Sequence, residues 1–182
     1  MRLSGITEES LVDGPGLRYV IFAQGCLHQC PHCHNRESWD VDGGAEFSVR
    51  HVIRTLKKHK NNVRGVTFSG GEPFLQAGEL AEVALAARRM GWDVVTYSGF
   101  TYEELIEMKD GNVMALLSAS DILIDGKYIH ELRDTGLPFR GSSNQRIIDV
   151  AQTQKSGEIT LWKKKKEFHT CLNKSTALSG VP

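Results

Sequence analysis

The stretch LRYVIFAQGC, residues 17–26, places a run rich in β-branched and aromatic residues directly before a cysteine. A short apolar run of this kind predicts a buried β-strand over residues 17–24. The next segment, GCLHQCPHCHN at residues 25–35, gives Cys26, Cys30 and Cys33 the spacing C-x3-C-x2-C. A buried strand that leads straight into a cluster of thiols predicts that the loop after it carries chemistry.

Downstream of this strand, helical and strand patterns alternate along the chain. Apolar strands are predicted at residues 63–68, 92–97, 121–125 and 145–150. Helices are predicted over residues 80–90 and 113–119. Two more helices are predicted to begin after Ser48 and after Thr101, the second with a capping box that Thr101 forms with Glu104. This alternation predicts an α/β fold in which parallel strands, covered by helices, curl into an open, partial β/α barrel. The 182 residues are too few for a complete barrel of eight units, which needs about 250.

Composition narrows the class of protein. The 22 basic and 22 acidic side chains cancel, which gives no reason to expect nucleic acid or an anionic membrane as a partner. No apolar run approaches the roughly 20 residues that span a bilayer, and the first residues contain no apolar signal segment. We therefore expect a cytoplasmic protein, in which clustered cysteines more often bind metal or do redox chemistry than form disulfides.

One domain is expected over residues 1–155, followed by a short and partly disordered tail over residues 156–182. The tail holds a run of four lysines, Lys163 to Lys166, which predicts a solvated surface. It also holds Cys171, a lone thiol to which the sequence assigns no role.

The three clustered cysteines predict a metal centre, and two kinds stay open. Each thiolate can bind one iron of a cubane [4Fe–4S] cluster, and because no fourth cysteine is near, one iron would keep a position for substrate. The alternative is a zinc ion completed by a histidine. Zinc modules usually pair two ligand couples across a loop of about 12 residues or more, so the single short segment favours the cluster. The interleaved histidines are His28, His32 and His34.

Polar and glycine residues follow each of the next predicted strands. Gly70, Gly71 and Glu72 come after the second strand, Ser98 after the third and Asp125 at the end of the fourth. Ligands of parallel sheets bind beyond the carboxyl ends of the strands. The order of these residues therefore predicts one site, which they share with the cysteine loop.

Several segments resemble a known superfamily. GCLHQCPHCHN and the later Gly-Gly-Glu resemble the signature of the radical S-adenosylmethionine enzymes, and VDGPGLRYVIFAQGC at residues 12–26 resembles the opening of the activases that install a glycyl radical in a partner enzyme. FRGSSNQRIID at 139–149 and ILIDGKY at 122–128 resemble more narrowly the activating proteins of the anaerobic ribonucleoside-triphosphate reductase. The resemblance spans about residues 10–150. It departs from the superfamily at His32, where an aromatic residue usually precedes the third cysteine.

The resemblance implies that Cys26, Cys30 and Cys33 hold a [4Fe–4S] cluster whose open iron is chelated by the methionine end of S-adenosylmethionine. An electron from the reduced cluster would split this cofactor into methionine and a 5′-deoxyadenosyl radical. Gly70 and Gly71 would let the backbone approach the methionine moiety without a Cβ clash. Glu72 would place negative charge near its amino group, and His32 and His34 would contact the adenosyl group.

Two more site residues follow from the resemblance, each with an alternative. Ser98 would hydrogen-bond the ribose or the methionine carboxylate, or else only form a turn or helix cap. Asp125 matches an acidic strand-end position of related activases, or else only forms an ion pair. The loop at residues 13–16 resembles the one that activases present near the partner's glycine, or else is a tight turn before a strand.

The expected partner is the large subunit of the anaerobic ribonucleoside-triphosphate reductase, from whose backbone glycine the radical takes a hydrogen atom. The expected electron source is a low-potential donor such as flavodoxin. The alternatives are an activase of a formate-lyase type enzyme, a radical enzyme acting on a free metabolite, and a zinc-binding interaction module. Residues 139–149 favour the reductase.

Overall fold

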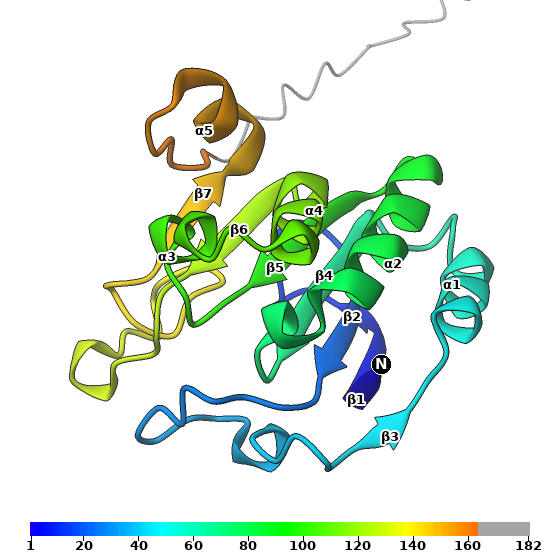
Figure 1. Ribbon diagram of the computed structural model, residues 1–182, viewed down its shortest axis with the longest axis horizontal. Coiled ribbons are helices and arrows are strands. Elements are labelled where there is room, and N and C mark those ends of the chain that lie inside the picture. Colours follow the sequence, from blue (N-terminus) through cyan, green and yellow to red (C-terminus); the bar gives the residue numbers. More distant parts are fainter. Residues whose placement is uncertain (164–182) are drawn as a thin grey trace, which may run out of the picture.

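The computed structural model describes residues 1–163 (Figure 1). Most of the lysine run, for which a solvated surface is predicted, lies outside the described residues. Cys171, which has no predicted role, also lies outside them. Within residues 1–163, none of the helices is long and apolar enough to cross a membrane.

Within the described residues, seven strands form one open sheet in the order β3-β1-β2-β4-β5-β6-β7 (Figure 1). The strands are β1 (Arg2–Ser10), β2 (Arg18–Ala23), β3 (Ala45–Glu46), β4 (Gly65–Gly70), β5 (Asp93–Tyr97), β6 (Ile122–Asp125) and β7 (Arg146–Asp149). The four central strands β2, β4, β5 and β6 are parallel. Their carboxyl ends therefore meet at one edge of the sheet.

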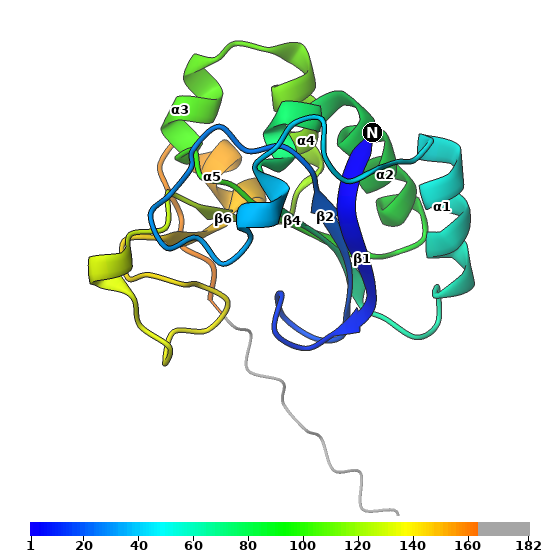
Figure 2. The ribbon, with the colours of Figure 1, turned by 90° about the horizontal axis from the view of Figure 1, so that it is seen from below.

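Helices cover one face of the sheet (Figures 1 and 2). They are α1 (Val49–Lys58), α2 (Ala77–Arg89), α3 (Tyr102–Glu107), α4 (Gly111–Ala119) and α5 (Val150–Ser156), with short 3-10 turns at Arg36–Ser38, Pro73–Gln76 and His130–Leu132. The predicted caps are confirmed, because Ser48 accepts a hydrogen bond from the His51 backbone N–H and Thr101 forms a capping box with Glu104. Leu80 and Leu116 lie fully buried in the main core, between helices and sheet.

The expectation of a parallel sheet is confirmed for the centre and wrong at the edges. β1 pairs antiparallel with β2, and β7 pairs antiparallel with β6. A parallel return needs a crossover, usually a helix, but only the short turn His130–Leu132 lies between β6 and β7. The chain therefore turns back beside β6. The strands form an open sheet, and its curling into a partial barrel stays a prediction.

The second face of the sheet holds a smaller apolar cluster. Val95, Ile122, Ile124 and Ile147 form it, and partly buried side chains pack on it from loops, including Trp162. The Trp162 backbone N–H donates to the Ile147 carbonyl at 2.8 Å, so the chain stays attached to β7 beyond α5. Loops rather than helices therefore cover this face, which leaves room for a site.

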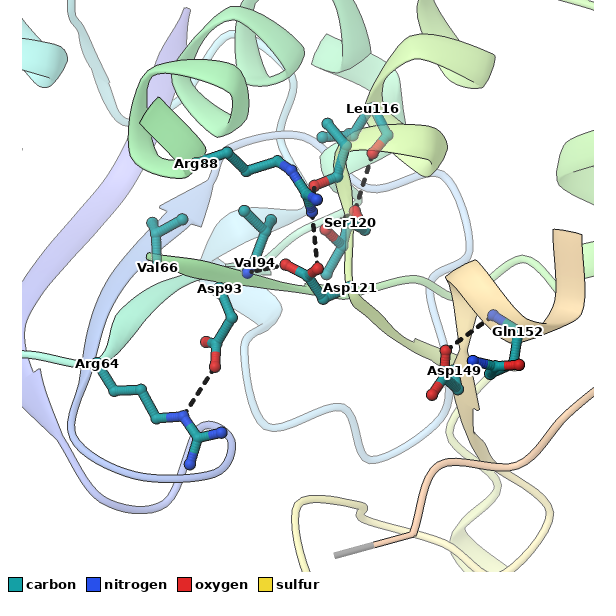
Figure 3. Close-up of polar contacts among 12 residues, drawn as sticks. Arg64, Val66, Arg88, Asp93, Val94, Leu116, Ser120, Asp121, Asp149 and Gln152 are labelled. Carbon is teal, nitrogen blue, oxygen red and sulfur yellow. Dashed lines mark hydrogen bonds and ion pairs between the residues drawn. The ribbon is translucent and has the colours of Figure 1, made fainter. Parts of the chain in front are cut away.

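Polar contacts join the edge at which the parallel strands begin (Figure 3). The Asp93 carboxylate, at the start of β5, accepts from Arg64 at 2.8 Å. Asp121, just before β6, accepts from the Val94 backbone N–H at 2.8 Å and pairs with Arg88 at 2.7 Å. These contacts hold the edge opposite the carboxyl ends, where backbone groups of neighbouring strands begin to pair.

Arg18 is the most buried charged side chain of this edge, with no exposed side-chain surface. Its guanidinium donates to the Thr67 hydroxyl at 3.1 Å, to the Val66 carbonyl at 2.6 Å, and to the carboxylate of Asp93. It thus links β2, β4 and β5. A buried charge with this many partners is costly to remove, because the partners then lose their donor away from water.

Replacing Arg18 with Met is expected to lower the free energy of unfolding by about 2–4 kcal/mol, since the Val66 and Thr67 acceptors would be left without a donor in a buried place. Urea unfolding followed by circular dichroism measures this change. Arg64→Met is the matched control, because Arg64 pairs with the same carboxylate from a side chain that is 55% exposed, and it should cost at most about 1 kcal/mol. Equal losses in the two variants would contradict this interpretation.

Candidate active site

The three clustered cysteines line one pocket of about 210 Å³ beyond the carboxyl ends of the parallel strands. All three are free thiols and half-buried. The other walls come from the ends of β4, β5 and β6, as the order of residues in the sequence predicted. They include Ser69, Gly70, Gly71, Tyr97, Ser98, Gly99, Gly126 and Tyr128.

Backbone contacts fix the base of the cysteine loop. The N–H groups of Gly25 and Cys26 donate to the carbonyls of Ser38 and Trp39, at 2.8 and 3.1 Å. Inside the loop, the Cys33 N–H donates to the Cys30 carbonyl at 3.1 Å, which forms a tight turn between two of the thiols. The loop is thus closed at its base and sharply turned at its tip.

Burial raises the pKa of the Cys26 and Cys30 thiols above their ordinary value. A thiolate in this pocket loses part of its hydration, and this favours the neutral thiol. Metals bind the thiolate form, so a metal that enters must displace these protons. Among residues 1–163, no three His, Cys, Asp or Glu side chains lie close enough together to hold a single metal ion.

Gly70 and Gly71 bring two strand ends closer than side chains would allow. Gly70 has a φ of +93°, in the region that favours glycine, and a Cβ on Gly71 would collide with the Gly25 carbonyl oxygen. The Gly71 N–H donates to the Ala23 carbonyl and the Glu72 N–H donates to the Gly25 carbonyl, both at 2.8 Å. The turn after β4 is therefore bound directly to the start of the cysteine loop.

Glu72 lies almost wholly inside the protein, with a side chain that is 1% exposed. Its carboxylate accepts from the Phe74 N–H at 3.0 Å, the Gly99 N–H at 2.8 Å and the Ser98 hydroxyl at 3.1 Å. The imidazole of His28 completes the set at 2.9 Å. Glu72 and Ser98, both predicted at this site, are thus brought together, and the Ser98 hydroxyl donates its hydrogen bond to Glu72.

Asp125 is not among the residues that line the cysteine pocket. Its carboxylate accepts from the Tyr102 backbone N–H at 2.8 Å and from Arg146 Nε at 3.0 Å. Hydrogen bonding from Arg146 also lowers the pKa of Glu103 on the neighbouring helix α3. The ion-pair alternative for Asp125 thus matches its contacts, while the next residue, Gly126, lines the pocket.

The two histidines beside Cys33 lie in different places. His34 lines the pocket, with its ring 5.4 Å from that of Tyr128. His32 is exposed, has a φ of +58°, and packs on His130 with 4.2 Å between ring centroids. Sequence reasoning treated His28 only as a possible zinc ligand. Its contact with Glu72 spans 44 positions of the chain, so no local pattern could have found it.

A second hollow of about 550 Å³ adjoins the pocket, and both are lined by His34, Ser69, Tyr97 and Gly141. It lies between the loop before β2 and the segment at residues 133–141. The exposed apolar side chains of Leu11 and Val12 stand at its rim. The cysteine pocket therefore shares walls with a larger groove on the face of the sheet that loops cover.

These features fit an iron–sulfur cluster and a cofactor beside it. Three free thiols line one pocket, and three glycines without side chains, Gly70, Gly71 and Gly99, form part of its wall. Thiolates are the usual ligands of such clusters, and a glycine-lined wall allows close approach of a cofactor's polar end.

Comparison with known proteins agrees with this geometry. Residues 12–148 match the family described as a 4Fe-4S single cluster domain. The anaerobic ribonucleoside-triphosphate reductase-activating protein of Vibrio cholerae is 37% identical over 144 residues, which are 75% of this chain and 90% of that protein. The protein of the same name from Enterobacteria phage T4 is 33% identical over 142 residues, 75% and 86% of the two chains. The pyruvate formate-lyase-activating enzyme of Listeria monocytogenes is 35% identical over 170 residues, 88% and 66%.

Fold and site together define an iron–sulfur protein of the radical S-adenosylmethionine type. Within that class, the chain belongs to the family of the anaerobic ribonucleoside-triphosphate reductase-activating proteins.

Replacing Gly71 with Ala should destabilise the protein by about 1–3 kcal/mol, because the added Cβ forces the turn after β4 away from the Gly25 carbonyl. Thermal unfolding of the metal-free protein measures this. Gly111→Ala is the control, since a Cβ there meets nothing within 4 Å and should leave stability unchanged or slightly higher. A Gly71→Ala variant as stable as the control would show that the two strand ends are not tightly apposed.

Proposed function

We propose that this chain is an activase that installs a glycyl radical on the anaerobic ribonucleoside-triphosphate reductase. The observation that carries the proposal is the set of three free thiols facing one pocket beside Gly70 and Gly71. The names of the relatives support the reductase as the partner. We place the reaction in the cytoplasm and propose a low-potential donor such as flavodoxin as the electron source.

Cys26, Cys30 and Cys33 would hold a [4Fe–4S] cluster, which, when bound, supplies the electron that cleaves S-adenosylmethionine into methionine and a 5′-deoxyadenosyl radical. The backbone at Gly70 and Gly71 would lie against the methionine end of the cofactor. His34 lines the same pocket and would contact the adenosyl end.

Glu72, Ser98 and Asp125 act on this site through the fold. The Glu72 carboxylate fixes the turn after β4 against the turn after β5 through Ser98 and the Gly99 N–H. Asp125 fixes the start of helix α3, which leaves Gly126 at the pocket wall. We propose that His32, which is exposed on the tip of the cysteine loop, contacts the adenosyl end from outside the pocket.

The groove beside the pocket would take the partner's glycine segment. It opens onto the pocket through shared walls, so a segment seated there would lie next to the cofactor. Its lining includes residues 11–13, and Asp13 begins the loop at residues 13–16 that resembles the one activases present to their partners. Arg140 also lines it, with one N–H donating to the Gln145 carbonyl at 2.8 Å.

Cys30→Ser should abolish formation of 5′-deoxyadenosine, because the cluster loses one of three thiolate ligands. Anaerobic reconstitution with iron and sulfide, followed by chromatography of the products, measures this. Cys171→Ser, outside the motif, is the control and should behave as the wild type. Wild-type protein that stays colourless and holds one zinc per chain would refute the cluster, and a fully active Cys30→Ser would refute the ligand assignment.

Incubation with S-adenosylmethionine, a reductant and the reductase large subunit should produce a glycyl-radical signal in the reductase by electron paramagnetic resonance. Because the Listeria relative is a pyruvate formate-lyase-activating enzyme, formate lyase serves as the comparison partner. A signal in formate lyase alone would show that the partner is wrong. Equal turnover of a small molecule without any partner would show that the chain is not an activase.

A further inference from the structure

His28 lies in the cysteine loop, midway between Cys26 and Cys30, and lines the cysteine pocket with a side chain that is only 7% exposed. Its Nε2 lies 2.9 Å from the Glu72 carboxylate, a distance at which the ring N–H donates a hydrogen bond. Of the three side chains between Cys26 and Cys30, it is the one with a hydrogen bond in the described part of the chain.

The imidazole of His28 packs between neighbouring groups on two sides. The ring makes an edge-type contact with the ring of Phe100, with 4.4 Å between ring centroids at an interplanar angle of 66°. On another side it packs against Gly99, where a Cβ would collide with the ring. The end of β5 is therefore built around His28, and the ring can neither tilt nor withdraw without losing these contacts.

The acceptor is itself immobile. The Glu72 carboxylate also receives the Phe74 N–H, the Gly99 N–H and the Ser98 hydroxyl, so its position is set by the turns after β4 and β5. The hydrogen bond from His28 to this carboxylate therefore restrains the position of the cysteine loop.

We propose that His28 is a positioning residue: its hydrogen bond to Glu72 and its packing on Gly99 hold the cysteine loop over the ends of β4 and β5, so that the three thiols face one pocket ready for the cluster. The inference rests on the proposed function. It adds a residue that acts through its hydrogen bond to Glu72 and not as a ligand of the cluster, and it gives the Glu72 carboxylate a role in loop geometry.

The test compares His28→Leu, which keeps an apolar side chain of similar size without a donor, with His28→Gln, whose amide nitrogen can reach Glu72. Each is reconstituted anaerobically with iron and sulfide and desalted. Iron per chain is then measured, along with the electron paramagnetic resonance spectrum of the reduced protein with and without S-adenosylmethionine. His51→Leu, at an exposed position of helix α1, is the matched control.

His28→Leu should retain less than half of the wild-type iron, and the change that S-adenosylmethionine causes in the spectrum should be reduced. His28→Gln should recover most of both, and His51→Leu should match the wild type. Full iron with an unchanged spectrum in His28→Leu would overturn the proposal. So would equal losses in His28→Leu and His28→Gln, because the hydrogen bond would then not carry the effect.

Circular dichroism of the metal-free variants shows whether they fold. If His28→Leu does not, Gly99→Ala decides, because its Cβ displaces the His28 ring and leaves the loop sequence intact. It should also lose iron, and full iron loading in it would overturn the proposal. A wild type that binds no cluster would instead refute the proposed function, so the two failures are distinguishable.

Discussion

The buried carboxylate of Glu72 is the interaction on which the arrangement of the site depends. A carboxylate that is 1% exposed is stable only if its oxygens are hydrogen-bonded, and four donors from three separate segments meet that need. Each donor belongs to a turn that lines the cysteine pocket or supports it. The energetic demand of one buried charge therefore brings the cysteine loop, the turn after β4 and the turn after β5 into a single geometry.

The sheet determines where the donors to the Glu72 carboxylate come together. Parallel strands β2, β4, β5 and β6 end at one edge, and the register that pairs Ala23 with Gly70 places the cysteine loop beside the Gly-Gly turn. At the other edge, buried Arg18 links β2, β4 and β5. The strands are thus fixed at their starts by a cation and at their ends by an anion. Of these two groups, only the Glu72 carboxylate lies next to the glycine backbone and the free thiols of the cysteine pocket.

Local patterns predicted the central strands, the helix caps at Ser48 and Thr101, and the gathering of the cysteines with Gly70 and Ser98. They failed for β1, because its residues are mostly polar and partly exposed, with only Leu3 and Ser10 buried. They failed for the direction of β7, which follows from the lack of a helix before it. The orientations of His28 and Asp125 depend on partners far along the chain, at Glu72 and Arg146, and sequence spacing does not encode them.

The groove beside the pocket is the surface that we propose for the partner's glycine segment. Leu11 and Val12 at its rim are 72% and 75% exposed, and burying such a side chain fully gains about 1.5–3 kcal/mol. Loops, not helices, cover this face, and the cysteine pocket opens through it. A partner segment that seats in the groove would bury these two side chains and close the pocket to water in the same step. The binding energy of the partner would then also shield the site from water.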